Sequence, residues 1–260
     1  MVFRSLGVFA QLSAAVWLAL AGGALADPYE DGLLAYNRGD FATALKVFRP
    51  LAESGDVRAE NALGRMYARG EGVAKDFAEA KLWFGRATEQ ERALSAYNSG
   101  DFAAALRMYR PLADKGQILA EYIVGLIYAN GQGVAQDYAE AMKWHRKAAE
   151  QGEAKAQFSV GVMYFKGLGV AADRAEAFKW YRRAANQGNA TAIYNLAAMY
   201  AKGESTPADL VTARMLYSLA ADRGIKAAAE AKQQLAASMS REQIAEADKR
   251  AAEWRPKPEH

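Results

Sequence analysis

Residues 153–188 read EAKAQFSVGVMYFKGLGVAADRAEAFKWYRRAANQG, and much of the remaining chain consists of copies of this stretch. The neighbouring copies are residues 118–152 and 189–224, and a fourth copy lies at residues 57–90. Tyrosine and glycine positions recur every 36 residues through the three consecutive copies. A fixed period of this length is typical of a solenoid of helical repeats.

Each copy predicts a first helix, a loop and a second helix. In the first helix, Ala156, Val160, Met163 and Tyr164 are four, three and one residues apart, so they share one face, which we expect to point to the core. The loop holds a Gly-x-Gly-Val sequence that stops the first helix. An Asp that follows, such as Asp173, is expected to cap the start of the second helix.

Two features of the repeat also have functional interpretations. The glycine loops are similar to phosphate-binding loops, but they lack a third glycine and a Lys-Ser/Thr pair and follow a helix instead of a strand, which favours a structural turn. Trp83, Trp144 and Trp180 could stack on a ligand. Because all three occupy one position of the repeat, we expect them to pack in the core.

A second duplication relates residues 27–56 to residues 91–117. The sequence AYN at residues 35–37 recurs at residues 96–98, an offset of 61 residues, and Gly-Asp-Phe follows in both places. These segments have a tight Asn-x-Gly-Asp turn where the other copies have the Gly-x-Gly-Val loop. We therefore expect each of them to be a plain pair of helices.

The composition excludes several classes of binding site and of catalytic site. The chain of 260 residues has 33 basic against 30 acidic residues, a formal charge of +3, which differs from the clustered basic excess of nucleic-acid binders. The absence of Cys excludes disulfides, thiolate metal sites and a cysteine nucleophile. His145 and His260 are too few for an imidazole metal site or a Ser-His-Asp triad. We therefore predict no catalytic residue, no metal and no cofactor.

Residues 1–26 have the layout of a cleaved secretory signal. Arg4 gives a positive start, an apolar stretch covers residues 6–20, and Ala-Leu-Ala at residues 24–26 precedes Asp27. A membrane anchor is the alternative, which the Gly-Gly pair after the apolar stretch disfavours, because a span needs about 18–25 apolar residues. We expect a mature chain that begins near Asp27, has no stable membrane span, and is periplasmic or secreted.

These motifs resemble the Sel1-like repeat family, whose members are relatives of the tetratricopeptide repeats. Residues 153–188 carry nearly every element of that repeat, namely Ala156, Val160, Gly161, Tyr164, Gly167, Gly169, Val170, Asp173, Ala177, Trp180, Tyr181, Ala184, Ala185 and Gly188. The resemblance implies an all-α fold, a right-handed α/α solenoid of Sel1-like and tetratricopeptide-like helical pairs. It also implies an adaptor or regulator that binds protein, and some exported bacterial members resemble regulators of envelope signalling. A branch linked to penicillin binding and lactam hydrolysis has a Cys framework that this chain lacks.

The repeats set the expected segment boundaries. In chain order we expect a signal peptide (1–26), a tetratricopeptide-like pair (27–56), a Sel1-like repeat (57–90), a second tetratricopeptide-like pair (91–117), two Sel1-like repeats (118–152 and 153–188), a divergent Sel1-like repeat (189–224), C-terminal capping helices (225–254) and a frayed tail (255–260). The divergent repeat has Glu-Ser-Thr-Pro after Gly203 in place of the usual loop. A Ser-x-x-Gln capping box is expected to begin the last helix at Ser240.

The outward face of the first helices is the expected binding surface, because solenoids present this face as a continuous groove. This face lies on the side of the first helices opposite the core-facing residues. Along the row of repeats its two ends are basic and its middle is apolar, which suits a partner segment with acidic residues and hydrophobic anchors. The candidate groove residues are Arg58, Arg65, Arg69, Leu119, Ile123, Leu126, Asn130, Lys155, Val162, Lys166, Asn195 and Lys202. In the alternative, Leu119, Ile123 and Leu126 face a neighbouring helix, because spacing fixes side-chain direction only approximately.

Three classes of function fit these observations. The first is a periplasmic scaffold or regulator that binds an unidentified protein partner, with no nucleic acid and with the oligomeric state left open. The second is a glycan or peptidoglycan binder that uses Tyr122, Phe158 and Tyr194, a row that could equally pack between helices. The third is a cell-wall hydrolase, which needs paired carboxylates about 5–10 Å apart. Since the carboxylates are explained as caps and surface charges, we expect a binding protein and no enzyme.

Overall fold

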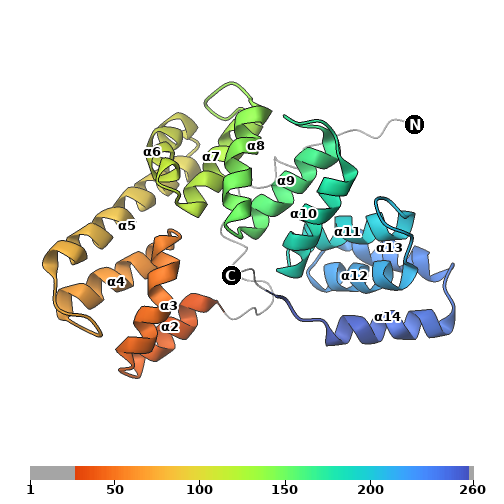
Figure 1. The fold of residues 1–260 in the computed structure, drawn as a ribbon, viewed down its shortest axis with the longest axis horizontal. Coiled ribbons are helices and arrows are strands. Elements are labelled where there is room, and N and C mark those ends of the chain that lie inside the picture. Colours follow the sequence, from red (N-terminus) through yellow and green to blue (C-terminus); the bar gives the residue numbers. More distant parts are fainter. Residues whose placement is uncertain (1–26, 258–260) are drawn as a thin grey trace. The chain divides into compact units, whose positions relative to one another are not determined.

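The computed structural model describes residues 27–257 (Figure 1). The predicted signal peptide at residues 1–26 therefore lies outside the described residues. The described part contains thirteen α-helices and no strand, which confirms an all-α helical-repeat fold. None of these helices combines the length and the apolar character needed to cross a bilayer. The right-handed winding stays a prediction.

The helices fall into two compact units, divided between Gln136 and Asp137. The first unit holds α2 (Pro28–Asn37), α3 (Phe41–Glu53), α4 (Val57–Arg69), α5 (Phe77–Asn98), α6 (Phe102–Asp114) and α7 (Ile118–Asn130). The second unit holds α8 (Tyr138–Glu150), α9 (Ala154–Lys166), α10 (Arg174–Asn186), α11 (Ala190–Lys202), α12 (Leu210–Asp222), α13 (Lys226–Ala236) and α14 (Arg241–Glu253). Within each unit the extensive contacts join helices adjacent in the chain, with the added pair α12 and α14.

The ends of the helices are set by the capping residues that the sequence marks. Asp76, Asp137 and Asp173 are N-caps whose carboxylates accept hydrogen bonds from two backbone amides of the first turn. Gly167 ends α9 in the left-handed conformation, with φ of +70°. At the start of α14, Ser240 forms the predicted capping box with Gln243. The structural interpretation of these motifs is confirmed.

The second glycine of each loop lies against the start of the second helix of the preceding pair. Gly169 has φ of +70°, and an added Cβ would overlap the backbone carbonyl of Tyr138, the first residue of α8. Gly133 and Gly72 make the same close approach to the starts of α6 and α3. The loop glycines therefore serve the packing of one repeat on the next.

The structure has no break at the boundary predicted between residues 90 and 91. Instead, α5 runs without interruption across it (Figure 1). In the later repeats the second helix ends near a left-handed glycine, namely Gly152, Gly188 and Gly224, with φ of +96°, +90° and +87°. The corresponding residue here is Glu91, whose Cβ disfavours the left-handed conformation. The helix therefore continues into the next pair.

The structure confirms that the repeated tryptophans pack in the core. Trp83, Trp144 and Trp180 are buried, as expected for packing residues. The indole N–H of Trp144 donates a hydrogen bond to the Glu140 carboxylate at 3.1 Å. This arrangement satisfies the polar atom of a buried aromatic side chain.

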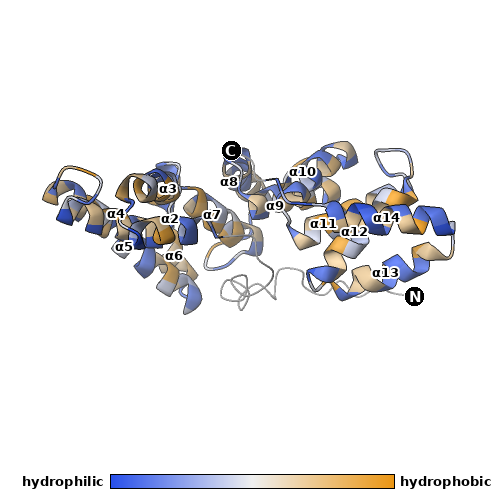
Figure 2. Ribbon diagram, turned by 90° about the horizontal axis from the view of Figure 1, so that it is seen from below, coloured by the Kyte–Doolittle hydropathy of each residue, from blue (hydrophilic) through white to orange (hydrophobic). Residues whose placement is uncertain are grey.

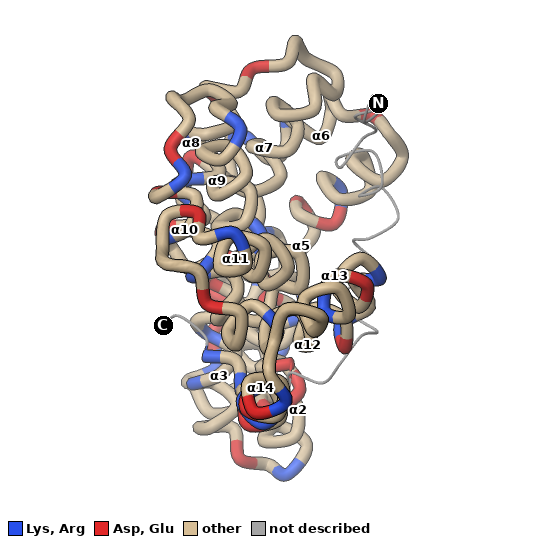
Figure 3. The backbone as a smooth tube through the Cα atoms, turned by 90° about the vertical axis from the view of Figure 1, so that its right-hand side faces the viewer, with Lys and Arg blue, Asp and Glu red and all other residues tan. Residues whose placement is uncertain are grey.

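The C-terminal helices α13 and α14 have the polar character expected of a solenoid cap. Hydrophilic residues predominate along α14 (Figure 2), and charges of both signs lie along it (Figure 3). The tail differs from the prediction in its described part. The backbone amide of Lys257 donates to the carbonyl of Asn186 at 2.8 Å, and the Arg223 guanidinium lies 4.8 Å from the centre of the Trp254 ring. These contacts hold the segment to the second unit.

Candidate partner-binding surfaces

The three candidate arginines of α4 are exposed, but they differ in their partners. The guanidinium of Arg58 lies 2.6 Å from an Asp27 carboxylate oxygen and 2.8 Å from one of Asp56. Two carboxylates thus neutralise its charge, and the side chain ties the start of α2 to α4. Arg69 forms a longer ion pair with a loop carboxylate at 3.7 Å. Arg65 makes no hydrogen bond or ion pair within the described residues, so it is the freest of the three cations.

The candidate residues of α7 do not form the expected open apolar centre. Leu119 is 39% exposed, but Ile123 and Leu126 are buried. Asn130 is half-buried and donates to the side chain of Gln132 at 3.3 Å. The alternative orientation therefore holds for Ile123 and Leu126, which serve packing, and only Leu119 stays accessible on this helix.

In the second unit, the candidate residues form a basic surface without an open apolar centre. Lys155 and Lys166 are exposed at opposite ends of α9 and form no ion pair within the described residues. Val162 between them is buried in the core of this unit. On α11, the half-buried Asn195 hydrogen-bonds to Tyr181 of α10. The exposed Lys202 has Glu204 nearby, with nitrogen and oxygen 3.8 Å apart.

The proposed glycan-binding row consists of half-buried side chains. The ring of Phe158 lies 5.8 Å from that of Tyr181, and the ring of Tyr194 lies 5.7 Å from that of Tyr217. Ring pairs at these distances are a normal part of helix packing. The contacts agree with the packing interpretation of this row.

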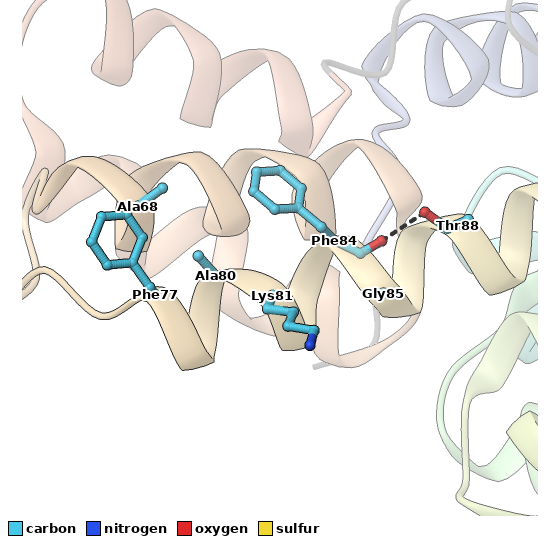
Figure 4. Close-up of a pocket in the computed structure, with 7 residues that line it drawn as sticks. All are labelled: Ala68, Phe77, Ala80, Lys81, Phe84, Gly85 and Thr88. Atoms are coloured by element: carbon cyan, nitrogen blue, oxygen red, sulfur yellow. Dashed lines mark hydrogen bonds between the residues drawn. The ribbon is translucent and has the colours of Figure 1, made fainter.

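A further accessible face, which the sequence analysis missed, lies on α5 of the first unit. Phe77, Lys81, Phe84, Gly85 and Thr88 follow one another at helical spacing and line a shallow depression of ≈ 410 Å³ (Figure 4). Phe77 is 67% exposed and Phe84 is 36% exposed. We call these five residues the α5 face. The sequence signal for it is the missing turn glycine at position 91, which lets α5 continue.

His145 is the one histidine among the described residues, and it is buried. Burial lowers the pKa of His145 to about 3, so this imidazole is neutral at physiological pH. No group of three or more His, Asp or Glu side chains within residues 27–257 is arranged to hold a metal ion.

The first unit contains one buried carboxyl with an unusual environment. Glu60 of α4 is fully buried, with one oxygen 3.3 Å from Arg86 Nε and 3.4 Å from Gln90 Nε2. Burial raises the pKa of Glu60 to about 7, against the opposing charge of Arg86. The folded state therefore binds a proton at this carboxyl more tightly than the unfolded state does.

This carboxyl predicts a pH dependence of stability. Between pH 4.5 and about 7 the folded chain holds more protons than the unfolded chain, so Glu60 lowers the free energy of unfolding as pH rises through this window. We expect Glu60→Gln to change stability little at pH 5 and to raise it by about 1–3 kcal/mol at pH 8, after allowance for partial solvent screening. Urea unfolding at both pH values measures the difference. The exposed Glu53→Gln is the control, because Glu53 does not act on Glu60, and an equal effect of Glu60→Gln at both pH values would contradict the assignment.

Comparison with known proteins places these features in a family. The model of the Sel1 repeat matches residues 57–91, 118–153, 154–189 and 190–225. No curated protein sequence shows significant similarity to the chain.

Two solved structures are among those similar to this chain. A Sel1 repeat protein from Oxalobacter formigenes is 29% identical, with a TM-score of 0.54, and the match covers 86% of this chain and 99% of that protein. The protective antigen c5321 of uropathogenic Escherichia coli, which has an SLR fold, is 24% identical, with a TM-score of 0.49 and coverage of 89% and 61%. Sel1 repeats generally mediate protein–protein interaction, and scaffolds built from them are typically non-catalytic. Since the repeat model matches more than half of the residues, the chain belongs to the Sel1 repeat family.

Proposed function

We propose that this protein is a periplasmic interaction module that holds an acidic segment of a partner protein on the first helices of its repeats and catalyses no reaction. The observation that carries the proposal is the pair Lys155 and Lys166, two exposed cations of α9 without an ion pair in the described chain. Arg58, in contrast, is held between two carboxylates. Unpaired cations at the expected binding surface favour recognition of carboxylates.

The spacing of the two lysines limits the partner segment. They are eleven positions apart on a regular helix, which corresponds to about 16 Å between their backbones. An extended peptide covers this length in about five residues. We therefore expect a partner segment with two acidic residues about five positions apart, each near one lysine.

The burial of Ile123, Leu126 and Val162 changes the expected energetics of this surface. Leu119 is the only accessible apolar candidate, so binding relies mainly on charge pairs at an exposed surface, which salt screens over about 10 Å. Such contacts set the association rate and the specificity more than the affinity. We expect a regulatory contact that is weak and salt-sensitive, as in envelope signalling.

The proposal predicts that the double variant Lys155→Glu and Lys166→Glu loses its partner, because each carboxylate then faces a like charge. Crosslinking and capture from periplasm, with the chain from Asp27 to His260 as bait, should show one discrete protein that is reduced at least about tenfold in the variant. The control is Lys226→Glu with Lys249→Glu, two exposed lysines on α13 and α14.

Three results would contradict the proposal. Equal capture by both double variants would place the contact elsewhere on the chain. Co-sedimentation with purified peptidoglycan, without any protein partner, would favour the glycan class. A chain that fractionates with the cytoplasm, with no processing before Asp27, would remove the periplasmic assignment.

A further inference from the structure

Three contacts in the second unit show how a second helix is normally covered by the pair that follows it. The loop glycine Gly169 lies against the start of α8 at Tyr138. Arg146 of α8 donates a hydrogen bond to the hydroxyl of Tyr164 on α9 at 2.8 Å. Tyr181 of α10 is buried and hydrogen-bonded to the following first helix α11. The first two contacts cover one side of α8, and the third buries the side chain at the corresponding repeat position of α10.

The α5 face lacks all three contacts. Phe77 stands at the position of Tyr138, but no loop glycine covers it and two-thirds of the residue is exposed. Gly85 stands at the position of Arg146, and a Cβ there would have no neighbour within 4 Å. Phe84 stands at the position of the buried Tyr181 and is 36% exposed. The side of the helix that is covered on α8 is therefore open on α5.

The continuity of α5 explains why the chain does not cover this face itself. The segment that should turn back and become the next first helix is the C-terminal part of α5, because Glu91 replaces the turn glycine. The extensive contacts of α5 are with α4 and α6. Neither helix takes the place of the missing first helix, since Phe77 stays largely exposed.

The charges near this face indicate the kind of partner. Lys81 is the only charged side chain that lines the depression over the α5 face. Further along the same side of α5, a second depression of ≈ 320 Å³ is lined by the exposed Met108, by Arg92, Arg107 and Lys115, and by a single carboxylate, Glu89. Together the two depressions have four cations and one anion. This excess favours an acidic partner and disfavours a second copy of the same face, because like charges would meet.

We propose that the α5 face docks an acidic amphipathic helix of another protein, which takes the place of the first helix missing from the repeat. Phe77 and Thr88 are eleven positions apart on α5, about 16 Å, which corresponds to three turns of a docked helix. A helix with apolar residues at positions i, i+3, i+4, i+7 and i+11 matches this length. Its acidic flank lies toward Lys81 and Arg92. This surface is separate from the lysine pair of α9.

Binding of a synthetic peptide tests the proposal. The probe is a labelled amphipathic helix of eighteen residues, with a leucine and alanine face and glutamates on both flanks, and the matched probe has lysine in place of each glutamate. Fluorescence anisotropy should show saturable binding of the glutamate peptide to the chain from Asp27 to His260. Phe77→Ser and Lys81→Glu should each weaken this binding at least about tenfold.

Matched variants separate this site from the rest of the molecule. Leu34→Ser removes an apolar side chain of α2 that is 52% exposed, and it should leave peptide binding unchanged. Lys155→Glu with Lys166→Glu should also leave it unchanged, even where that variant loses the partner of α9. Phe84 is avoided, because its ring packs against Gly64 of α4 and its loss would disturb the fold.

Four outcomes would overturn the proposal. These are no saturable binding of the glutamate peptide, equal binding of both peptides, binding that survives Phe77→Ser, or a dimer in light scattering that Phe77→Ser converts to a monomer. The last result would assign the face to a second copy of the chain.

Discussion

Gly169→Ala should destabilise the second unit by about 3–5 kcal/mol, because two separate costs add at this position. With φ of +70°, any Cβ meets the steric penalty of the left-handed conformation, about 1–2 kcal/mol. The same Cβ would overlap the backbone carbonyl of Tyr138 at the start of α8, and a backbone group cannot move aside as a flexible side chain can. Relief requires the loop to separate from α8, which gives up packing between two repeats.

Gly224→Ala provides a control that isolates the first cost. Its φ is +87°, but an added Cβ would have no neighbour within 4 Å. We expect a loss of only about 1–2 kcal/mol for this variant. Urea unfolding followed by far-ultraviolet circular dichroism gives both values. Equal losses would show that close approach to α8 contributes nothing and that Gly169 is needed for its conformation alone.

Trp144→Ala should cost about 3–5 kcal/mol, which is usual for removal of a large buried aromatic side chain. The indole is 1% exposed, so its removal leaves a cavity that the surrounding helices can fill only in part. The variant also removes the indole donor that Glu140 accepts at 3.1 Å. We expect Trp144→Phe to recover part of the loss, since it keeps a ring but not the donor.

Trp254→Ala is the matched control for Trp144→Ala. Trp254 is half-buried near the C-terminus, so its loss should lower stability by clearly less, about 1 kcal/mol. Thermal unfolding of the three tryptophan variants and of the parent chain gives the order of their stabilities. A stable Trp144→Ala protein that no longer captured its partner would revive the interpretation of the tryptophan row as a ligand-stacking site.

The fold could be predicted from the sequence where the signal is local and repeated. Asp137 and Asp173 cap their helices through bonds to amides two and three residues away, so their role does not depend on distant neighbours. The loop glycines show their role through recurrence, because the same conformation is needed in each copy. Trp144 could be assigned to the core for the same reason, since a position repeated in every copy serves the contact that every copy makes.

The candidate surface could be predicted only in part. Lys155 and Lys166 are exposed because long cationic side chains reach water from almost any position at the edge of a helix face. Burial of Ile123 and Leu126 depends on which neighbours approach α7, and spacing along one helix contains no information about them. The pKa of Glu60 likewise depends on Arg86 and on burial by other helices. The α5 face could have been predicted only by comparing Glu91 with the turn glycines of the other repeats, which is a difference at one residue.

The pattern of helix contacts has a consequence for the order of folding. Apart from α12 with α14, every extensive contact joins consecutive helices, so the chain segments that must meet are close in sequence. Loop closure then costs little conformational entropy, and helical proteins with such local contacts fold quickly. Each helix pair can begin to pack as soon as its second helix is complete, without waiting for the C-terminus. A chain that emerges end first from a ribosome or a membrane channel would therefore gain structure steadily, and its apolar stripes would stay exposed only briefly.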